Sequence, residues 1–308
     1  MVRRYSICVP TNCIWSCENL EQITNTVYQI AKTLTLFNIQ ECVVLEVKRP
    51  AKSNKAHPGK HGELTDSMLI SSLLQYFITP PYLRKIVFKS KFQSYFQYAS
   101  KLPKLSVLPY MRNDDSKAVK EFREGVSIPM RRPVNGKKVN KQTKYICIGK
   151  EKPIELKTQL VPSNVRVTVN IKENKIVSPH DAYGEGNVGM NASYGYGVRI
   201  AHSFNEVFTQ MMIPYEQSCW IECGEFYKKN SDDNKLSKLD ELRDGNVLII
   251  FGSWDKLQDS LVKDEEIVNI SQFMDGQWEL PNVIPQGHLT VEDACMVAMT
   301  SVSMKYYL

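Results

Sequence analysis

Hydrophobic positions in the first ninety residues follow the spacing of strands and of helices in turn. Arg4–Pro10 alternates between polar and apolar residues, which predicts a strand, and the compact apolar run Glu41–Val47 predicts a second, buried strand. Apolar residues three or four positions apart predict a helix over Asn19–Leu36, and a second helix is predicted over Thr65–Phe77. This order of strand, helix, strand, helix favours an α/β fold, in which helices cover a parallel sheet.

The spacing changes after Pro103, where short apolar runs alternate with polar turns and none is long enough for a helix. Short strands joined by turns are typical of a small antiparallel barrel or sandwich. The predicted strands are Glu124–Met130, Lys144–Ile148, Ile154–Thr158 and Val165–Ile171.

Helical and buried-strand patterns return in the last third of the chain. We predict a helix over Arg199–Met211, a strand over Val247–Phe251 and a terminal helix over Thr290–Tyr306. Two domains are therefore expected. An α/β domain is made of residues 1–110 and 180–308, and an all-β domain is inserted at 111–179.

The composition is that of a globular protein, with 43% hydrophobic and 23% charged residues among 308. Its longest apolar runs fall well short of the roughly 20 residues that a membrane span needs, so we expect no membrane segment. The eight cysteines are expected to be reduced thiols, which predicts a cytosolic or nuclear protein. The pairs Cys13/Cys17 and His57/His61 lack C-x-x-C spacing, and the His pair lies in a Pro/Gly loop, so we expect no metal.

Positive charge is concentrated in the middle of the chain. Residues 101–177 contain 18 Lys/Arg and 7 Asp/Glu, a net charge of +11, whereas residues 201–308 contain 8 and 18, a net charge of −10. Such a basic stretch is either a solvated loop region or a module that binds a polyanion.

Two candidate ligand-binding loops lie in the last third. The strand at Val247–Phe251 leads directly into Gly252 and Ser253, where small residues let the main chain approach a ligand closely. A Pro/Gly loop at 282–287 leads into Thr290 and Asp293, a variant of the capping box that begins a helix. The two loops either enclose a ligand of adenosine size or are ordinary turns of an α/β sheet.

These loops resemble a known family. Phe251-Gly-Ser253, Asn282-x-x-Pro-Gln-Gly287 and Thr290-x-Glu-Asp-Ala294 resemble the second and third cofactor loops of SPOUT (trefoil-knot) methyltransferases, above all a eukaryotic and archaeal RNA methyltransferase subgroup with an OB-like insert. Other blocks of that subgroup occur in order along nearly the whole chain: Arg4–Pro10, Pro80–Lys85, Phe122–Gly125, Val165–Val169, Lys175–Ser178 and Gly195–Ile200.

The resemblance implies an α/β fold with a trefoil-knotted parallel sheet and a small inserted OB-like β-barrel. It implies an RNA methyltransferase that uses S-adenosylmethionine on a base or ribose of an RNA such as ribosomal RNA, forms a homodimer and resides in the nucleus or nucleolus. The residues implied to bind the cofactor are Trp220, Ile221, Glu222, Phe251, Gly252, Ser253, Asn282, Val283, Ile284, Pro285, Gly287 and Thr290.

An OB-like insert suits the basic stretch, because such barrels bind single-stranded nucleic acid through backbone electrostatics and aromatic stacking. RNA is favoured over DNA by the resemblance alone. The residues expected to bind RNA are Arg123, Arg131, Arg132, Lys137, Lys138, Lys141 and Lys144.

Arg199 is the candidate catalytic residue, because a fixed cation near the cofactor can lower the pKa of the methyl acceptor or bind a phosphate. It is otherwise a structural ion-pair arginine. The chain departs from the family in the first loop, where Trp220 replaces a small residue, and the third loop is short. These departures leave a second hypothesis open, a catalytically degenerate paralogue that acts as an RNA-binding or assembly factor.

Overall fold

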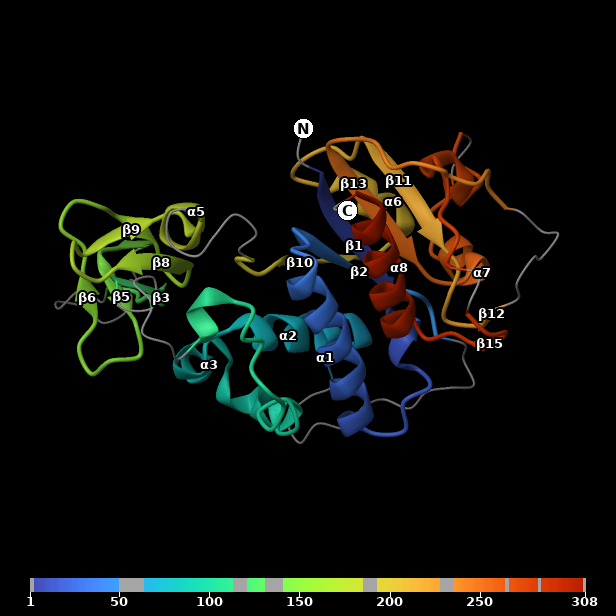
Figure 1. The fold of residues 1–308 in the computed structure, drawn as a ribbon. Coiled ribbons are helices and arrows are strands. Elements are labelled where there is room, and N and C mark those ends of the chain that lie inside the picture. Colours follow the sequence, from blue (N-terminus) through green and yellow to red (C-terminus); the bar gives the residue numbers. More distant parts are fainter. Residues whose placement is uncertain are drawn as a thin grey trace. The chain divides into compact units, whose positions relative to one another are not determined.

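The structure, a computed structural model, describes residues 3–49, 64–112, 121–130, 141–184, 193–227, 235–263, 266–281 and 284–306. The chain forms two compact units (Figure 1). The first contains residues 1–75, 94–102 and 195–308, and the second contains residues 76–93 and 103–194. The second unit includes the predicted insert 111–179 and extends beyond it on both sides.

The first unit is built on a six-stranded, wholly parallel sheet in the order β10-β2-β1-β13-β11-β14. The parallel sheet predicted from the sequence is therefore confirmed. Its strands are β1 (Arg4–Pro10), β2 (Glu41–Leu45), β10 (Gly197–Ala201), β11 (Gln217–Ile221), β13 (Asn246–Phe251) and β14 (Gly276–Gln277). The same unit contains a separate, short antiparallel pair, formed by β12 (Phe226–Tyr227) and β15 (Gly287–His288).

Helices cover both faces of this sheet. On one face, α1 (Leu20–Leu36) and α8 (Val291–Tyr306) lie side by side, and α8 contacts β13 (Figure 1). On the other face, α6 (Phe204–Thr209) and α7 (Trp254–Asp259) pack against the alternate strand residues, in a core that includes Cys8, Trp220 and Leu248. The helix α2 (Asp66–Ile78) follows β2 in sequence.

Most helix and strand ends lie close to those predicted from the sequence, but one predicted helix is partly wrong. Asn19 caps α1 by accepting the N–H of Gln22 at 2.9 Å, as the predicted helix start requires. The helix predicted over Arg199–Met211 is wrong in its first part. Residues up to Ala201 pair with β2 as an edge strand, and the helix begins only after the cap residue Ser203.

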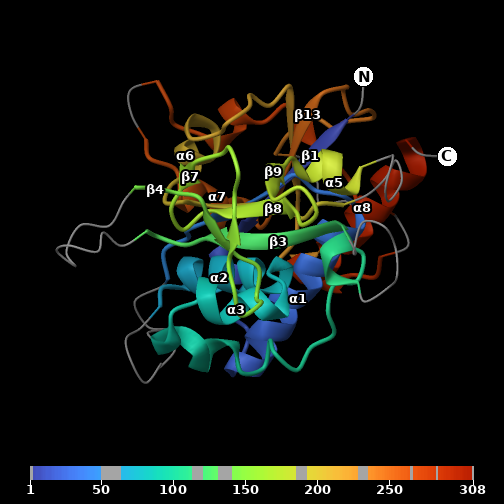
Figure 2. The same cartoon turned by 90° about the vertical axis from the view of Figure 1, so that its left-hand side faces the viewer.

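The second unit contains a five-stranded antiparallel sheet in the order β6-β5-β3-β8-β9, which Figure 2 shows with β3 and β8 in front. Its small core is made of Ile146, Ile148, Leu156 and Val169. A small antiparallel β unit was expected from the sequence. The strands are β3 (Phe122–Ser127), β5 (Tyr145–Cys147), β6 (Ile154–Glu155), β8 (Arg166–Asn170) and β9 (Lys175–Val177), with the separate pair β4 (Gln142–Thr143) and β7 (Val161–Pro162).

Short helices complete the described chain. They are the helices α3 (Pro81–Val87) and α5 (Pro179–Tyr183) and the 3-10 turns η1 (Thr11–Ile14), η3 (Ser90–Phe96), η4 (Pro109–Met111) and η5 (Ile270–Phe273). All eight cysteines are free thiols, as predicted. No helix in the described part of the chain has the length and apolar character needed to span a membrane.

Candidate active site

The structure brings the three predicted cofactor loops together at the carboxyl ends of β11 and β13. The N–H of Gly252 donates to the carbonyl of Ile221 at 3.3 Å, which joins the second loop to the first. The N–H of Gly224 donates to Leu289 O at 2.7 Å and the N–H of Leu289 donates to Glu225 O at 3.2 Å, which joins the first loop to the third. Loops that are far apart in the sequence therefore form one main-chain frame.

Three of the predicted cofactor-binding side chains are buried in the core: Trp220, Ile221 and Phe251. Trp220 packs on the α6/α7 face, edge-on to Trp254 with ring centroids 5.1 Å apart, and its Nε1–H donates to Gly252 O at 2.8 Å. At these three positions only the main chain is left to meet a ligand. The Trp220 side chain instead holds the turn at Gly252 in place through its hydrogen bond to the Gly252 carbonyl.

A cavity of about 190 Å³ opens beside this frame. It is bordered by the exits of β1 and β11, by α7 and by the third loop. The lining residues are Asn12, Cys13, Trp15, Ser16, Gly224, Glu225, Lys256, His288, Thr290 and Val291. Of these, only Thr290 was predicted from the sequence. Asn12 and Lys256 were missed, although residues that follow parallel strands, as Asn12 does, are the usual site residues of such sheets.

The surroundings fit an adenosyl methyl donor in two respects. Among the described residues, Asn12 Oδ1 and Ser253 Oγ are buried without a hydrogen-bond partner, so both oxygens have capacity for a hydrogen bond to a polar ligand or to water. Gly287 has nothing within 4 Å of the position that a Cβ would take, so space is open at the third loop. The cavity is smaller than the roughly 300 Å³ at which pockets enclose a whole ligand, so it suits one part of the donor, such as the base.

The third loop is held by the start of α8. The N–H of Asp293 donates to Thr290 Oγ1 at 3.3 Å, as in the predicted capping box. The Thr290 hydroxyl donates in return to Asp293 Oδ2 at 2.9 Å. The shorter Asp thus binds the cap hydroxyl, where a Glu would reach the cap N–H.

The remaining predicted cofactor residues vary in exposure. Glu222 is half-buried, and burial, together with the nearby Glu225 carboxylate, raises the pKa of its carboxyl group. Ile284 is half-buried and Pro285 is exposed, in a turn in which Ile284 N–H donates to Pro281 O. The predictions for Asn282 and Val283 lie outside the described residues.

Arg199 is not brought to the cofactor loops. It lies in β10, and its guanidinium donates to both oxygens of Glu41, at 3.1 and 3.3 Å, where β2 begins. It also donates to the carbonyls of Glu206 and Val207 and to the hydroxyl of Tyr215. This geometry is that of a structural ion pair between β10, β2 and α6, and the catalytic role of Arg199 stays a prediction.

Arg199→Ala is expected to lower the free energy of unfolding by about 2–3 kcal/mol, because it removes charge-assisted hydrogen bonds and leaves the half-buried Glu41 without its counter-charge. Denaturant unfolding measures the change. Arg243→Ala is the matched control, because that side chain is 64% exposed and its ion pair with Asp275 is long, at 3.7 Å, and therefore weak. Equal losses in the two variants would contradict a structural role for Arg199.

The comparison with known proteins decides the family. Residues 4–302 match the model of the family described as "Putative RNA methyltransferase". The chain belongs to this family. Two Saccharomyces cerevisiae proteins, each named putative methyltransferase, are 38% and 36% identical to it; the matches cover 98% and 97% of this chain and 94% and 87% of theirs. A Drosophila melanogaster protein named 28S rRNA (uridine-N(3))-methyltransferase is 26% identical over 97% of this chain and 62% of its own length.

The described part of the basic stretch contains three of the residues predicted to bind RNA, namely Arg123, Lys141 and Lys144. Arg123 Nε donates to Ile148 O at 2.9 Å, and its guanidinium stacks over Tyr82 at 4.1 Å, so it is engaged within the second unit. Lys144 pairs with Glu155, while Lys141 is exposed. The predictions for Arg131, Arg132, Lys137 and Lys138 lie outside the described residues.

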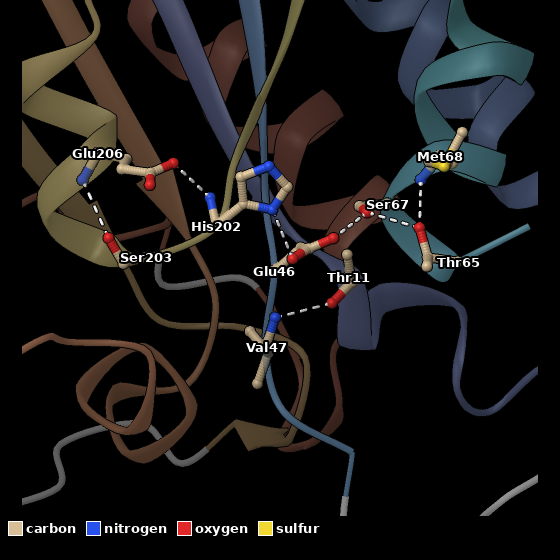
Figure 3. Close-up of polar contacts among 9 residues, drawn as sticks. All are labelled: Thr11, Glu46, Val47, Thr65, Ser67, Met68, His202, Ser203 and Glu206. Atoms are coloured by element: carbon tan, nitrogen blue, oxygen red, sulfur yellow. Dashed lines mark hydrogen bonds and ion pairs between the residues drawn. The ribbon is translucent and has the colours of Figure 1, made fainter.

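One polar cluster at the carboxyl edge was missed by the sequence analysis altogether. Glu46 follows β2, His202 follows β10, and the His202 ring lies 2.8 Å from the Glu46 carboxylate (Figure 3). Ser67, near the start of α2, donates its hydroxyl to the same carboxylate. Neither strand end was marked in the sequence, since Glu46 fell inside the predicted strand Glu41–Val47 and His202 fell inside the predicted helix Arg199–Met211. Among the described residues there is no group of three or more ligating side chains that would hold a metal ion.

Proposed function

We propose that this chain transfers a methyl group from S-adenosylmethionine to a ring nitrogen of a uridine in large-subunit ribosomal RNA. The observation that carries the proposal is the convergence of the three loops on a cavity beside buried, unpartnered polar atoms. The uridine acceptor is supported by the name of the Drosophila melanogaster relative, a 28S rRNA (uridine-N(3))-methyltransferase.

The chain's own groups would hold the donor mainly through the main chain at residues 221–224, 252–253 and 284–290. The side chains of Asn12 and Ser253 would add hydrogen bonds from their unpartnered oxygens. When bound, S-adenosylmethionine supplies an electrophilic methyl group on a sulfonium. The protein's task is to orient that group towards the acceptor nitrogen and to exclude water from it.

We also infer a trefoil knot in the first unit and an OB-like barrel in the second. The knot is supported by the strand order, since β13 follows β11 in the chain yet lies between β1 and β11. It is further supported by the return of the chain end, as α8, to pack on α1. The OB-like form is supported by the antiparallel five-stranded sheet and its small apolar core.

Binding of RNA by the basic stretch should depend strongly on salt. If six of its Lys/Arg side chains contact phosphates, the logarithm of the association constant falls with the logarithm of salt concentration with a slope of about −4 to −5. Filter binding over a salt series measures it. Replacing Lys137 and Lys138 together by alanine should make the slope shallower by about 2, whereas a slope unchanged by that variant would contradict phosphate contacts there.

A homodimer in the nucleus, the nucleolus included, completes the proposal. Leu36 on α1 and Met304 on α8 are 47% and 61% exposed, and the two helices are neighbours, which suits a surface that a second copy covers. An rRNA acceptor suits a nucleolar protein.

Catalysis is favoured over the hypothesis of a degenerate paralogue. That hypothesis rests on Trp220 and on the short third loop. The Trp220 side chain is buried on the α6/α7 face and does not line the cavity, and the third loop is joined to the first through the main chain of Leu289. The test is transfer of a labelled methyl group from S-adenosylmethionine to RNA from cells that lack the protein. We expect incorporation at a large-subunit uridine, and no incorporation would overturn the proposal.

A further inference from the structure

Glu46 and His202 form a dyad at the carboxyl edge of the parallel sheet (Figure 3). They follow the neighbouring strands β2 and β10. His202 Nδ1 lies 2.8 Å from Glu46 Oε2, and the His202 side chain is 64% exposed. The other ring nitrogen, Nε2, has no partner among the described residues, so the dyad presents a free imidazole nitrogen to solvent.

Both members of the dyad are held in place from other elements. The Ser67 hydroxyl donates to Glu46 Oε1, and Thr65 Oγ1 lies 3.1 Å from Ser67 Oγ. The backbone N–H of His202 donates to Glu206 Oε2 at 2.8 Å. Because the Glu46 carboxylate accepts from Nδ1, the neutral ring carries its proton on Nδ1, which leaves Nε2 as the basic atom.

Stability alone gives little reason for this arrangement. An ion pair as exposed as this one contributes little to folding, since water and salt screen it. The two strands are already joined by their parallel ladder and by the pair of Arg199 with Glu41. A carboxylate that orients an imidazole with one free nitrogen is, by contrast, a recurrent arrangement for general acid–base catalysis.

The dyad and the cavity border the same edge of the sheet. Thr11 Oγ1, next to the cavity residue Asn12, accepts the N–H of Val47 at 3.0 Å, and Val47 follows Glu46. The cavity residue Trp15 donates its Nε1–H to Asp66 at 2.9 Å, and Asp66 precedes Ser67. Only β2 separates β10 from β1, so the ends of these strands are about 10 Å apart, and a nucleotide bound over β2 would meet both sites.

We propose that His202 Nε2 is the base that accepts the proton of a nucleobase ring N–H as that nitrogen is methylated, an inference that rests on the proposed function. The proton moves to Nε2, and the nitrogen uses its electron pair to bond the methyl carbon. The carbon–sulfur bond breaks and its electron pair goes to sulfur. The positive charge of the sulfonium thus ends on the imidazolium, which then releases its proton to water.

The charges that face the imidazole suit this task. The hydrogen bond and charge of Glu46, with a smaller contribution from Glu206, raise the pKa of His202. A base whose pKa is raised is a better match for a weakly acidic ring N–H. The base must be neutral, so the transfer rate should rise with pH through the pKa of His202. Glu46→Gln removes the raising charge and should move that rise to lower pH.

The test is single-turnover methyl transfer to RNA by the full chain over a pH series, with donor affinity measured separately by calorimetry. His202→Asn keeps an N–H donor for Glu46 but has no basic nitrogen. It should slow transfer by about 100- to 10,000-fold near neutral pH, with the donor affinity unchanged. His180→Asn, on an exposed histidine of α5, is the matched control and should transfer at the rate of the unaltered chain.

Each result bears on the proposal. A slow His202→Asn variant and a pH profile of Glu46→Gln shifted to lower pH would support it. If the unaltered chain methylates RNA and His202→Asn does so at the same rate, the base is another group and only this inference fails. If the unaltered chain binds the donor but transfers no methyl group to RNA, the proposed function fails and the inference fails with it.

Discussion

Glu124→Ala is expected to lower the free energy of unfolding of the second unit by about 3–5 kcal/mol, because it removes a buried carboxylate and leaves the half-buried Arg166 without its counter-charge. The Glu124 side chain is 6% exposed and accepts three hydrogen bonds. The donors are Arg166 Nε at 2.7 Å, Thr168 Oγ1 at 2.6 Å and the Tyr183 hydroxyl at 3.3 Å. Without the carboxylate, these three donors between β3, β8 and α5 lose their shared acceptor.

Scanning calorimetry, combined with hydrogen exchange of β8, measures this loss. The control is Glu155→Ala, whose carboxylate is 54% exposed and pairs with Lys144 in the same sheet. An exposed pair contributes only about 0–1 kcal/mol, so the control should unfold almost as the unaltered chain does. If both variants lose the same stability, the Glu124 network does not support the unit as described.

Gly287→Trp is expected to weaken binding of S-adenosylmethionine by about 100-fold or more, equivalent to about 2.7 kcal/mol, while leaving the folded chain intact. Nothing lies within 4 Å of the position that a Cβ would take at Gly287, so the new side chain has room. The open space beside Gly287 belongs to the third loop. Gly287 pairs there with Tyr227, and the next residue, His288, lines the cavity. The indole would occupy the volume that the donor needs.

Equilibrium dialysis with labelled donor measures the affinity, and the melting temperature checks the fold. Gly197→Trp is the matched control, because Gly197 is exposed and begins β10 at the opposite edge of the sheet, with only Gln40 O within 4 Å of its Cβ position. Donor affinity should be unchanged in this control. Undiminished affinity in Gly287→Trp would place the donor elsewhere.

The sequence predicted the parallel sheet well because strands buried on both faces have a distinctive pattern. Cys42–Leu45 and Val247–Phe251 are apolar at successive positions, which is a signal of central strands in an α/β sheet. The last three residues of the edge strand β10, Arg199–Ala201, were misassigned as helix because the capped helix that starts at Phe204 has helical spacing. Only pairing with β2, a contact across more than 150 residues, makes that segment a strand.

The candidate site was predictable as loops but not as side chains. Glycines at 224 and 252 adopt positive φ, and the main-chain frame around Gly252 was visible in the sequence as a small-residue turn after a strand. The orientation of the Trp220 side chain could not be predicted from the sequence, because it depends on which face of β11 meets α6 and α7. The same holds for Arg199, Glu46 and His202, whose partners come from other strands.

Hydrogen–deuterium exchange of the unaltered chain, with and without S-adenosylmethionine, tests most directly whether the three loops form the donor site. We expect slower exchange at residues 221–225, 252–254 and 287–291, with exchange unchanged in β10 at 197–201 and in the sheet of the second unit. Protection confined to other segments, or no protection at saturating donor, would contradict it.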